Sequence, residues 1–122
     1  MSVVRTIDTS PPSYRFLAYQ GDPIDVELQL SVDGQPADVD GWVWAAQIDT
    51  GGVTISWDCT GLPNGVGLYL RGVDTLRLPQ RDSRFDVVGR HPDAGEGRTV
   101  LRGSIMAAKR ITPPLREAVL RD

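Results

Sequence analysis

The segment that decides the fold is residues 24–32, IDVELQLSV, in which every second residue is apolar. A β-strand turns successive side chains to opposite faces, so the apolar residues would share one face, whereas a helix would scatter them around its circumference. Asp33 and Gly34 come next, and this pair favours the positive φ angles of a tight turn. We therefore predict a long strand with one buried face, closed by a turn.

The same alternation returns in the middle of the chain. Residues 42–48 and 53–57 both alternate, and turn-forming residues separate them at positions 49–52, so we predict a hairpin. Its inward-facing positions would place three tryptophans in the core, where they would supply much of the buried area. These are Trp42, Trp44 and Trp57.

Further short apolar stretches lie at residues 14–19, 66–70, 85–87 and 101–107, with glycines and prolines largely between them. Many turns between many short strands, spaced at roughly eight to twelve residues, are typical of a sandwich. The predicted fold class is all-β, an immunoglobulin-like antiparallel β-sandwich. Residues 61–65 are expected to form a loop, and a short piece with Leu76 and Leu78 ends at Pro79.

The length of 122 residues fits one domain. Residues 1–13 end in two prolines, which restrict the backbone, and are predicted to form an extended N-terminal arm. The sandwich would occupy residues 14–112. Residues 113–122 begin with two prolines followed by LREAVLRD, which predicts a short C-terminal helix.

Both chain ends carry apolar residues that a sandwich of this size need not bury itself, so we predict that the ends form a protein interface. Arginine is also enriched at interfaces, because its planar group pairs with carboxylates. The predicted interface residues are Val3, Val4, Ile7, Ile111, Leu115, Arg116, Val119 and Leu120.

Charge is distributed unevenly along the chain. Residues 1–97 hold seven basic and fourteen acidic side chains, whereas residues 98–122 hold six and two. A basic end could bind nucleic acid or dock on the acidic body of a neighbouring copy. No aromatic residue follows Phe85 and the isoelectric point is about 5.0, so nucleic acid is disfavoured and the neighbouring copy is preferred.

The sequence predicts neither a membrane-spanning segment nor an internal disulfide. The longest apolar run, Trp42–Ala46, is far shorter than the roughly 20 residues that cross a bilayer, and the N-terminus lacks a signal core. Cys59 is the single cysteine, so it has no internal partner. We expect no membrane association, and synthesis and assembly in the cytoplasm.

Residues that could carry chemistry are isolated from one another. His91 lies in a glycine- and proline-containing loop without a recognisable nucleophile motif, and nothing near Cys59 suggests a lowered pKa. Asp38 with Asp40, and Asp93 with Glu96, supply too few oxygens for calcium and lack EF-hand spacing. We therefore expect no enzyme, cofactor or metal.

Several features occur in an order that resembles a known family. They are Gly21-Asp22 before the long strand, the Asp33-Gly34-Gln35-Pro36 turn, the Val39-Asp40-Gly41 lead, Arg84-Phe85-Asp86-Val87, and Leu101-Arg102-Gly103. Over residues 16–112 this order resembles the immunoglobulin-like amino-terminal domain of siphophage baseplate upper proteins and related small phage tail proteins.

The resemblance implies a non-enzymatic virion structural protein, a minor tail or baseplate component that docks onto other tail proteins around a symmetric axis, as a homo-oligomeric ring or similar assembly. The chain stops almost where the domain ends, which favours an anchoring role over host binding. Two alternatives remain open. One is a capsid decoration or head-completion protein, and the other is a bacterial carbohydrate- or ligand-binding module, which would require exposed tryptophans.

Overall fold

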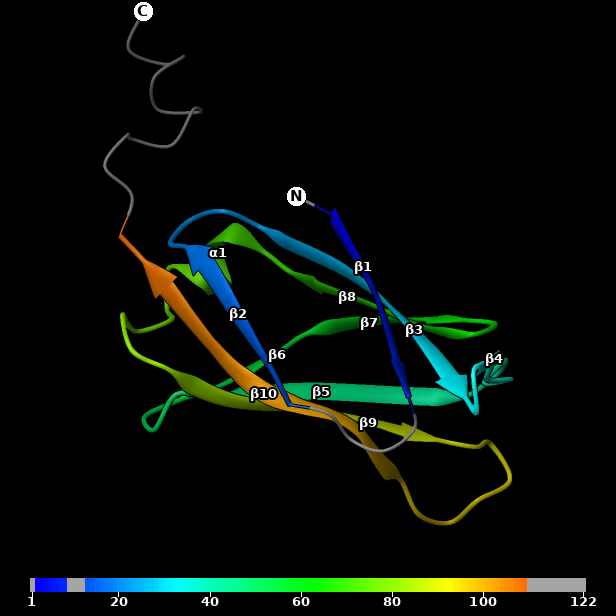
Figure 1. The fold of residues 1–122 in the computed structure, drawn as a ribbon. Coiled ribbons are helices and arrows are strands. Elements are labelled where there is room, and N and C mark those ends of the chain that lie inside the picture. The colour runs from blue at the N-terminus through cyan, green and yellow to red at the C-terminus, as the bar shows by residue number, and fades with distance from the viewer. Residues whose placement is uncertain (1, 9–12, 110–122) are drawn as a thin grey trace, which may run out of the picture.

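A computed structural model describes residues 2–8, for the backbone, and residues 13–109 in full. Short strands dominate, in keeping with the period-two pattern. In chain order the elements are β1 (Ser2–Asp8), β2 (Ser13–Tyr19), β3 (Ile24–Val32), β4 (Gln35–Pro36), β5 (Val43–Asp49), β6 (Thr54–Ser56), β7 (Asp58–Leu62), β8 (Gly65–Leu70), α1 (Gly72–Thr75), β9 (Ser83–Arg90) and β10 (Arg98–Ala108). They form two five-stranded sheets packed face to face, which confirms the predicted all-β sandwich (Figure 1).

Sheet I has the order β1-β3-β8-β7, with β4 also paired to β3, and sheet II has the order β2-β10-β9-β5-β6. An immunoglobulin sandwich places strands A-B-E-D in one sheet and G-F-C in the other. The paths β1-β3-β8-β7 and β10-β9-β5 reproduce that arrangement. In sheet II, β2 is an additional strand beside β10 and β6 one beside β5.

The deciding segment is β3, as predicted. Val26, Leu28 and Leu30 are buried, while the residues between them lie on the outer side. Asp33 and Gly34 have φ angles of 50° and 78°, the pair of positive values that a type I′ turn requires. Glycine adopts this backbone without steric cost, and the turn leads directly into β4.

The predicted hairpin is formed by β5 and β6, which pair antiparallel with Ile48 opposite Ile55. The prediction for the tryptophans is only partly right. Trp57 is 4% exposed and packs against Phe85, at the point where the chain crosses from sheet II to sheet I. Trp42 and Trp44 are only half-buried and pack against the core cluster from its outside.

One local prediction was wrong. Residues 61–65 are not one loop, because β7 continues to Leu62 and β8 begins at Gly65. The segment DCTGL has no apolar alternation, so its pairing with β8 could not be detected locally. Between β8 and the piece with Leu76 and Leu78 lies a helical turn, α1, whose four residues are too few to show a helical period in the sequence.

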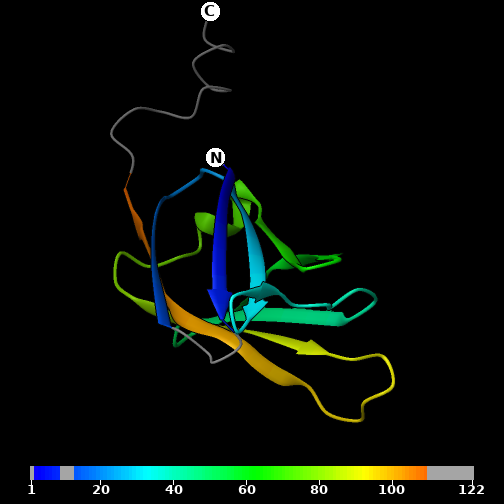
Figure 2. The same cartoon turned by 45° about the vertical axis from the view of Figure 1, so that its right-hand side comes forward.

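The sheets are not purely antiparallel. β1 pairs parallel with β3, from Ser2 opposite Asp25 to Asp8 opposite Ser31, and β2 pairs parallel with β10 (Figures 1 and 2). Within the N-terminal segment of residues 1–13, Ser2–Asp8 form a strand of sheet I. The predicted C-terminal helix at 113–122 lies outside the described residues.

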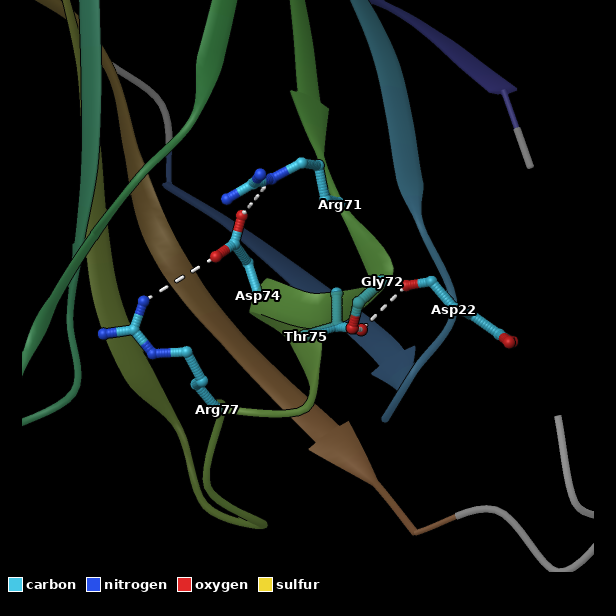
Figure 3. A network of polar contacts seen from close by, with 6 residues as sticks. All are labelled: Asp22, Arg71, Gly72, Asp74, Thr75 and Arg77. Carbon is cyan, nitrogen blue, oxygen red and sulfur yellow. Dashed lines mark hydrogen bonds and ion pairs between the residues drawn. The ribbon is translucent and has the colours of Figure 1, made fainter.

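A polar network fixes α1 against the turn between β2 and β3 (Figure 3). The buried carboxylate of Asp74 accepts a hydrogen bond from Arg71 at 3.1 Å and lies 3.7 Å from Arg77. The Thr75 hydroxyl accepts from the Gly21 amide at 2.9 Å and lies 2.9 Å from the carbonyl oxygen of Asp22. The turn between β2 and β3 is therefore joined to the connection between β8 and β9.

No helix within residues 2–8 and 13–109 is long and apolar enough to span a membrane. The core lies between the sheets, with both supplying fully buried side chains. Among the largest are Leu28, Leu68 and Leu70 from sheet I and Ile48, Ile55, Leu101 and Ile105 from sheet II.

Candidate interaction surfaces

The His91 side chain makes a hydrogen bond within its own loop. Its Nδ1 accepts a hydrogen bond from the Asp93 amide at 3.1 Å, and its ring meets Trp42 edge-on with centroids 6.2 Å apart. A general base needs a nucleophile or substrate proton within hydrogen-bond reach. The Nδ1 atom of His91 is therefore already used in a hydrogen bond within its own loop.

Cys59 is half-buried on β7, with its sulfur 3.8 Å from the Trp57 carbonyl oxygen. Burial raises the pKa of this thiol above its ordinary value, and the nearby Asp58 carboxylate raises it further. Both effects disfavour the thiolate, which is the reactive form. The environment is therefore the opposite of the one that activates a catalytic cysteine.

One of the carboxylates considered as a calcium ligand, Asp38, is used in a turn. Asp38 Oδ1 accepts a hydrogen bond from the Asp40 amide at 3.3 Å, the local bond of an Asx turn. Across residues 2–8 and 13–109, no group of three His, Cys, Asp or Glu side chains is placed to share a metal ion.

The three tryptophans do not form an exposed platform. Trp57 is in the core, and Trp42 and Trp44 stack on each other with ring centroids 5.8 Å apart. The indole N–H groups of Trp44 and Trp57 are buried, with no partner among the described residues. The condition set for a carbohydrate-binding module, three tryptophans exposed on one face, is not met.

The outer face of sheet I is acidic. β3, β7 and β8 carry Asp25, Glu27 and Asp58 and no basic residue. Arg71 follows β8 and interacts electrostatically with Asp58 and Tyr69, but its guanidinium donates to Asp74. Tyr69 is 41% exposed and lies directly between Asp25 and Asp58 in the sheet register. We call Asp25, Glu27, Asp58 and Tyr69 the acidic face.

The outer face of sheet II is basic. Its strands carry five arginines against two aspartates. Arg84 and Arg102 line a shallow groove of about 720 Å³ across β5, β9 and β10, together with Asp49 and Asp86. No hydrogen bond or ion pair among the described residues uses the guanidinium of Arg84 or Arg102, whereas Arg15 pairs with Asp82 at 3.2 Å. We call Arg84, Arg102 and this groove the basic face.

An apolar groove of about 440 Å³ lies between the sheets, beside the turn that joins β2 to β3. Phe16, Leu17 and Tyr19 line it from β2, and Ile24 and Val26 line it from β3. Leu17 and Tyr19 are 58% and 52% exposed. An apolar lining with exposed aromatic surface is typical of a binding groove.

The strand register places the start of β1 and the end of β10 near this groove. β1 starts with Ser2 opposite Asp25, at the start of β3, and β10 ends with Ala108 opposite Tyr19, at the end of β2. The amide of Gln20 donates to the Ala108 carbonyl at 2.8 Å, so the chain leaves β10 beside the apolar groove.

The predicted interface residues divide accordingly. Val3, Val4 and Ile7 lie on β1, opposite Val26, Glu27 and Leu30 of β3. Ile111, Leu115, Arg116, Val119 and Leu120 lie outside the described residues. Sequence reasoning missed the acidic and basic faces. Charge was compared between the two ends of the chain, whereas the acidic and basic side chains are separated between the two outer faces of the sandwich. The acidic face could have been found from the polar positions of residues 24–32, which include Asp25 and Glu27.

No protein-family model and no curated protein sequence matches the chain. Among solved structures it is similar to the N-terminal domain of phage TP901-1 ORF48, with a TM-score of 0.60, 15% identity, and coverage of 89% of this chain and 100% of that one. It also matches the cysteine protease inhibitor EhICP2 from Entamoeba histolytica, with a TM-score of 0.46, 11% identity, and coverage of 88% and 97%. The first likeness shows the fold, and the second is too weak to support an argument.

Proposed function

We propose that this chain is a non-enzymatic structural protein of a phage virion, a minor tail or baseplate component that docks onto other tail proteins through its chain ends. The observation that carries the proposal is the match to a phage domain along that domain's whole length. The order of turn and strand motifs in residues 16–112 points to the same class of protein. The protein would be made in the cytoplasm of the bacterial host and reside in the virion.

The geometry of the chain ends supports docking rather than catalysis. The start of β1 and the end of β10 lie at one end of the sandwich, next to the apolar groove. β1 is the last described strand of sheet I, and an edge strand can pair with a strand from another protein. The segment that follows β10 supplies further apolar residues, among them Ile111, Leu115 and Val119.

A truncation tests the role of the C-terminal end. Deleting residues 113–122 removes none of the strands that the structure describes, so the variant is expected to keep its far-ultraviolet circular dichroism and its unfolding midpoint while failing to enter particles. Particle content is measured by mass spectrometry of purified virions. As a matched control, replacing the exposed loop residue Glu96 by Gln should leave incorporation unchanged.

Location within the particle separates tail from capsid. Purified tails and purified heads are analysed in parallel, and the protein is expected in the tail fraction. Recovery in heads alone would favour a capsid decoration protein instead. Full incorporation of the truncated variant would refute the role proposed for the C-terminal end.

A further inference from the structure

We propose that copies of this chain associate head to tail, with the acidic face of one copy on the basic face of the next. The inference deepens the proposed function, on which it rests for the expectation that copies assemble. It concerns the outer faces of the sheets and does not involve the chain ends.

The acidic face has the character of an interface centre. Tyr69 projects from the middle of sheet I, and Asp25 and Asp58 flank it on the neighbouring strands. The next outward-facing position on β8 is Gly67, opposite Glu27, so the surface beside the ring carries no competing side chain on that strand. A rigid aromatic ring beside carboxylates is a common binding hot spot, because the ring is ordered at little entropic cost.

The basic face offers the complementary arrangement. Arg84 and Arg102 lie on adjacent strands, and the register places Arg84 opposite Asp49 of β5 and Arg102 opposite Asp86 of β9. Both are exposed, and neither guanidinium is used by the described residues. The groove between them is open and polar, and it is large enough to receive a tyrosine side chain. Arginine favours carboxylates because its planar fork can donate two hydrogen bonds at once.

The occupant that fits is a second copy of this chain, because each face finds its opposite charge on the other side of the same molecule. Two acidic faces would repel each other, which disfavours a two-fold symmetric dimer through that face. A head-to-tail contact joins different surfaces and therefore repeats, giving a ring if the rotation closes and a stack if it does not. Nucleic acid could use only the basic face and would leave the acidic face unexplained.

Sedimentation velocity of the full-length chain tests the contact. The wild type should associate in about 20 mM NaCl, and its apparent dissociation constant should rise about tenfold or more in about 500 mM NaCl, because salt screens exposed charges. Reversing the acidic face with Asp25→Lys/Glu27→Lys, or the basic face with Arg84→Glu/Arg102→Glu, should weaken association at low salt by about tenfold or more.

Mixing identifies the head-to-tail geometry. An equal mixture of the two reversed variants pairs an intact basic face with an intact acidic face, so association should return. A single chain with all four substitutions has its two faces exchanged in sign and should also associate. As a control, Asp40→Lys/Glu96→Lys makes the same change in net charge in exposed loops and should leave association unchanged.

Each variant is first checked by circular dichroism and thermal unfolding. If a reversed variant fails to fold, the neutral pairs Asp25→Asn/Glu27→Gln and Arg84→Gln/Arg102→Gln replace it, with the same weakening expected. A monomeric wild type at low salt over a roughly hundredfold concentration range would overturn the inference. So would equal weakening by the loop control, or a mixture that stays monomeric. Removal of residues 113–122 should leave this contact intact, so its loss and the loss of particle docking are distinguishable.

Discussion

The inner faces of sheets I and II are alike, and their outer faces are opposites. Inside, both sheets present fully buried aliphatic side chains, such as Leu68 in sheet I and Ile105 in sheet II. Outside, β3, β7 and β8 are acidic, while the strands of sheet II carry an excess of arginine. Folding constrains only the inner side of each strand, because outer side chains remain in water whatever their sign. The outer positions are thus free to encode recognition.

The largest effect should come from truncating matched residues on the two inner faces. Leu68→Ala and Ile105→Ala each leave a cavity in a fully buried position, and each should lower the free energy of unfolding by about 2–5 kcal/mol. Chemical denaturation monitored by tryptophan fluorescence measures both. A cost below about 1 kcal/mol at one of them would show that the two inner faces are not equivalent, since full burial predicts a larger loss.

A smaller effect is expected where the two sheets are joined. Thr75→Val keeps the side-chain shape but removes the hydroxyl that accepts from the Gly21 amide, so the free energy of unfolding should fall by about 1–3 kcal/mol. Thr60→Val, at an exposed position on β7, is the matched control and should change it by less than about 0.5 kcal/mol. Equal effects at the two threonines would refute a joining role for the Thr75 hydroxyl.

Neighbouring residues on β7 allow the inner and outer sides of one strand to be compared directly. The pKa of Cys59 is raised by burial, so at a given pH less of it is thiolate than of a free cysteine, and the alkylation rate should rise only at higher pH. At pH about 8, native Cys59 should react with iodoacetamide about tenfold or more slowly than the unfolded chain.

The matched variant is Cys59→Ser/Thr60→Cys, which moves the thiol to the outer side and should react nearly as fast as an unfolded cysteine. Mass spectrometry of the alkylated protein gives both rates. Equal rates at positions 59 and 60 in the folded protein would contradict the assignment of Cys59 to the inner side.

The smallest effect on folding should follow changes on the outer faces. Arg84→Gln/Arg102→Gln removes two exposed charges that no described hydrogen bond or ion pair uses, so the free energy of unfolding should change by less than about 1 kcal/mol in total. Thermal and chemical unfolding at a concentration where the chain is monomeric measure this. A large loss would mean that the arginines serve the fold rather than recognition.

The sequence by itself determined those strands whose residues alternate, and the side of each that is buried. Period-two alternation is a local property, so residues 24–32 could be assigned to a strand with Val26, Leu28 and Leu30 inside, and Asp33-Gly34 to the turn that follows. Where alternation is absent, as in β7, or the element is only four residues long, as in α1, no local signal marked the element.

Only the tertiary structure decided which strands pair outside the predicted hairpin of β5 and β6. The strands β2 and β10 pair although they are far apart in the sequence, and β1 pairs with β3 although β2 lies between them in the chain. Because neither parallel pair is joined by a tight turn, no turn residues in the sequence specify these pairings. The same register sets Tyr69 between Asp25 and Asp58, and places Arg84 and Arg102 together on the opposite side of the molecule. Burial is encoded residue by residue, whereas a surface exists only once distant strands have been placed side by side.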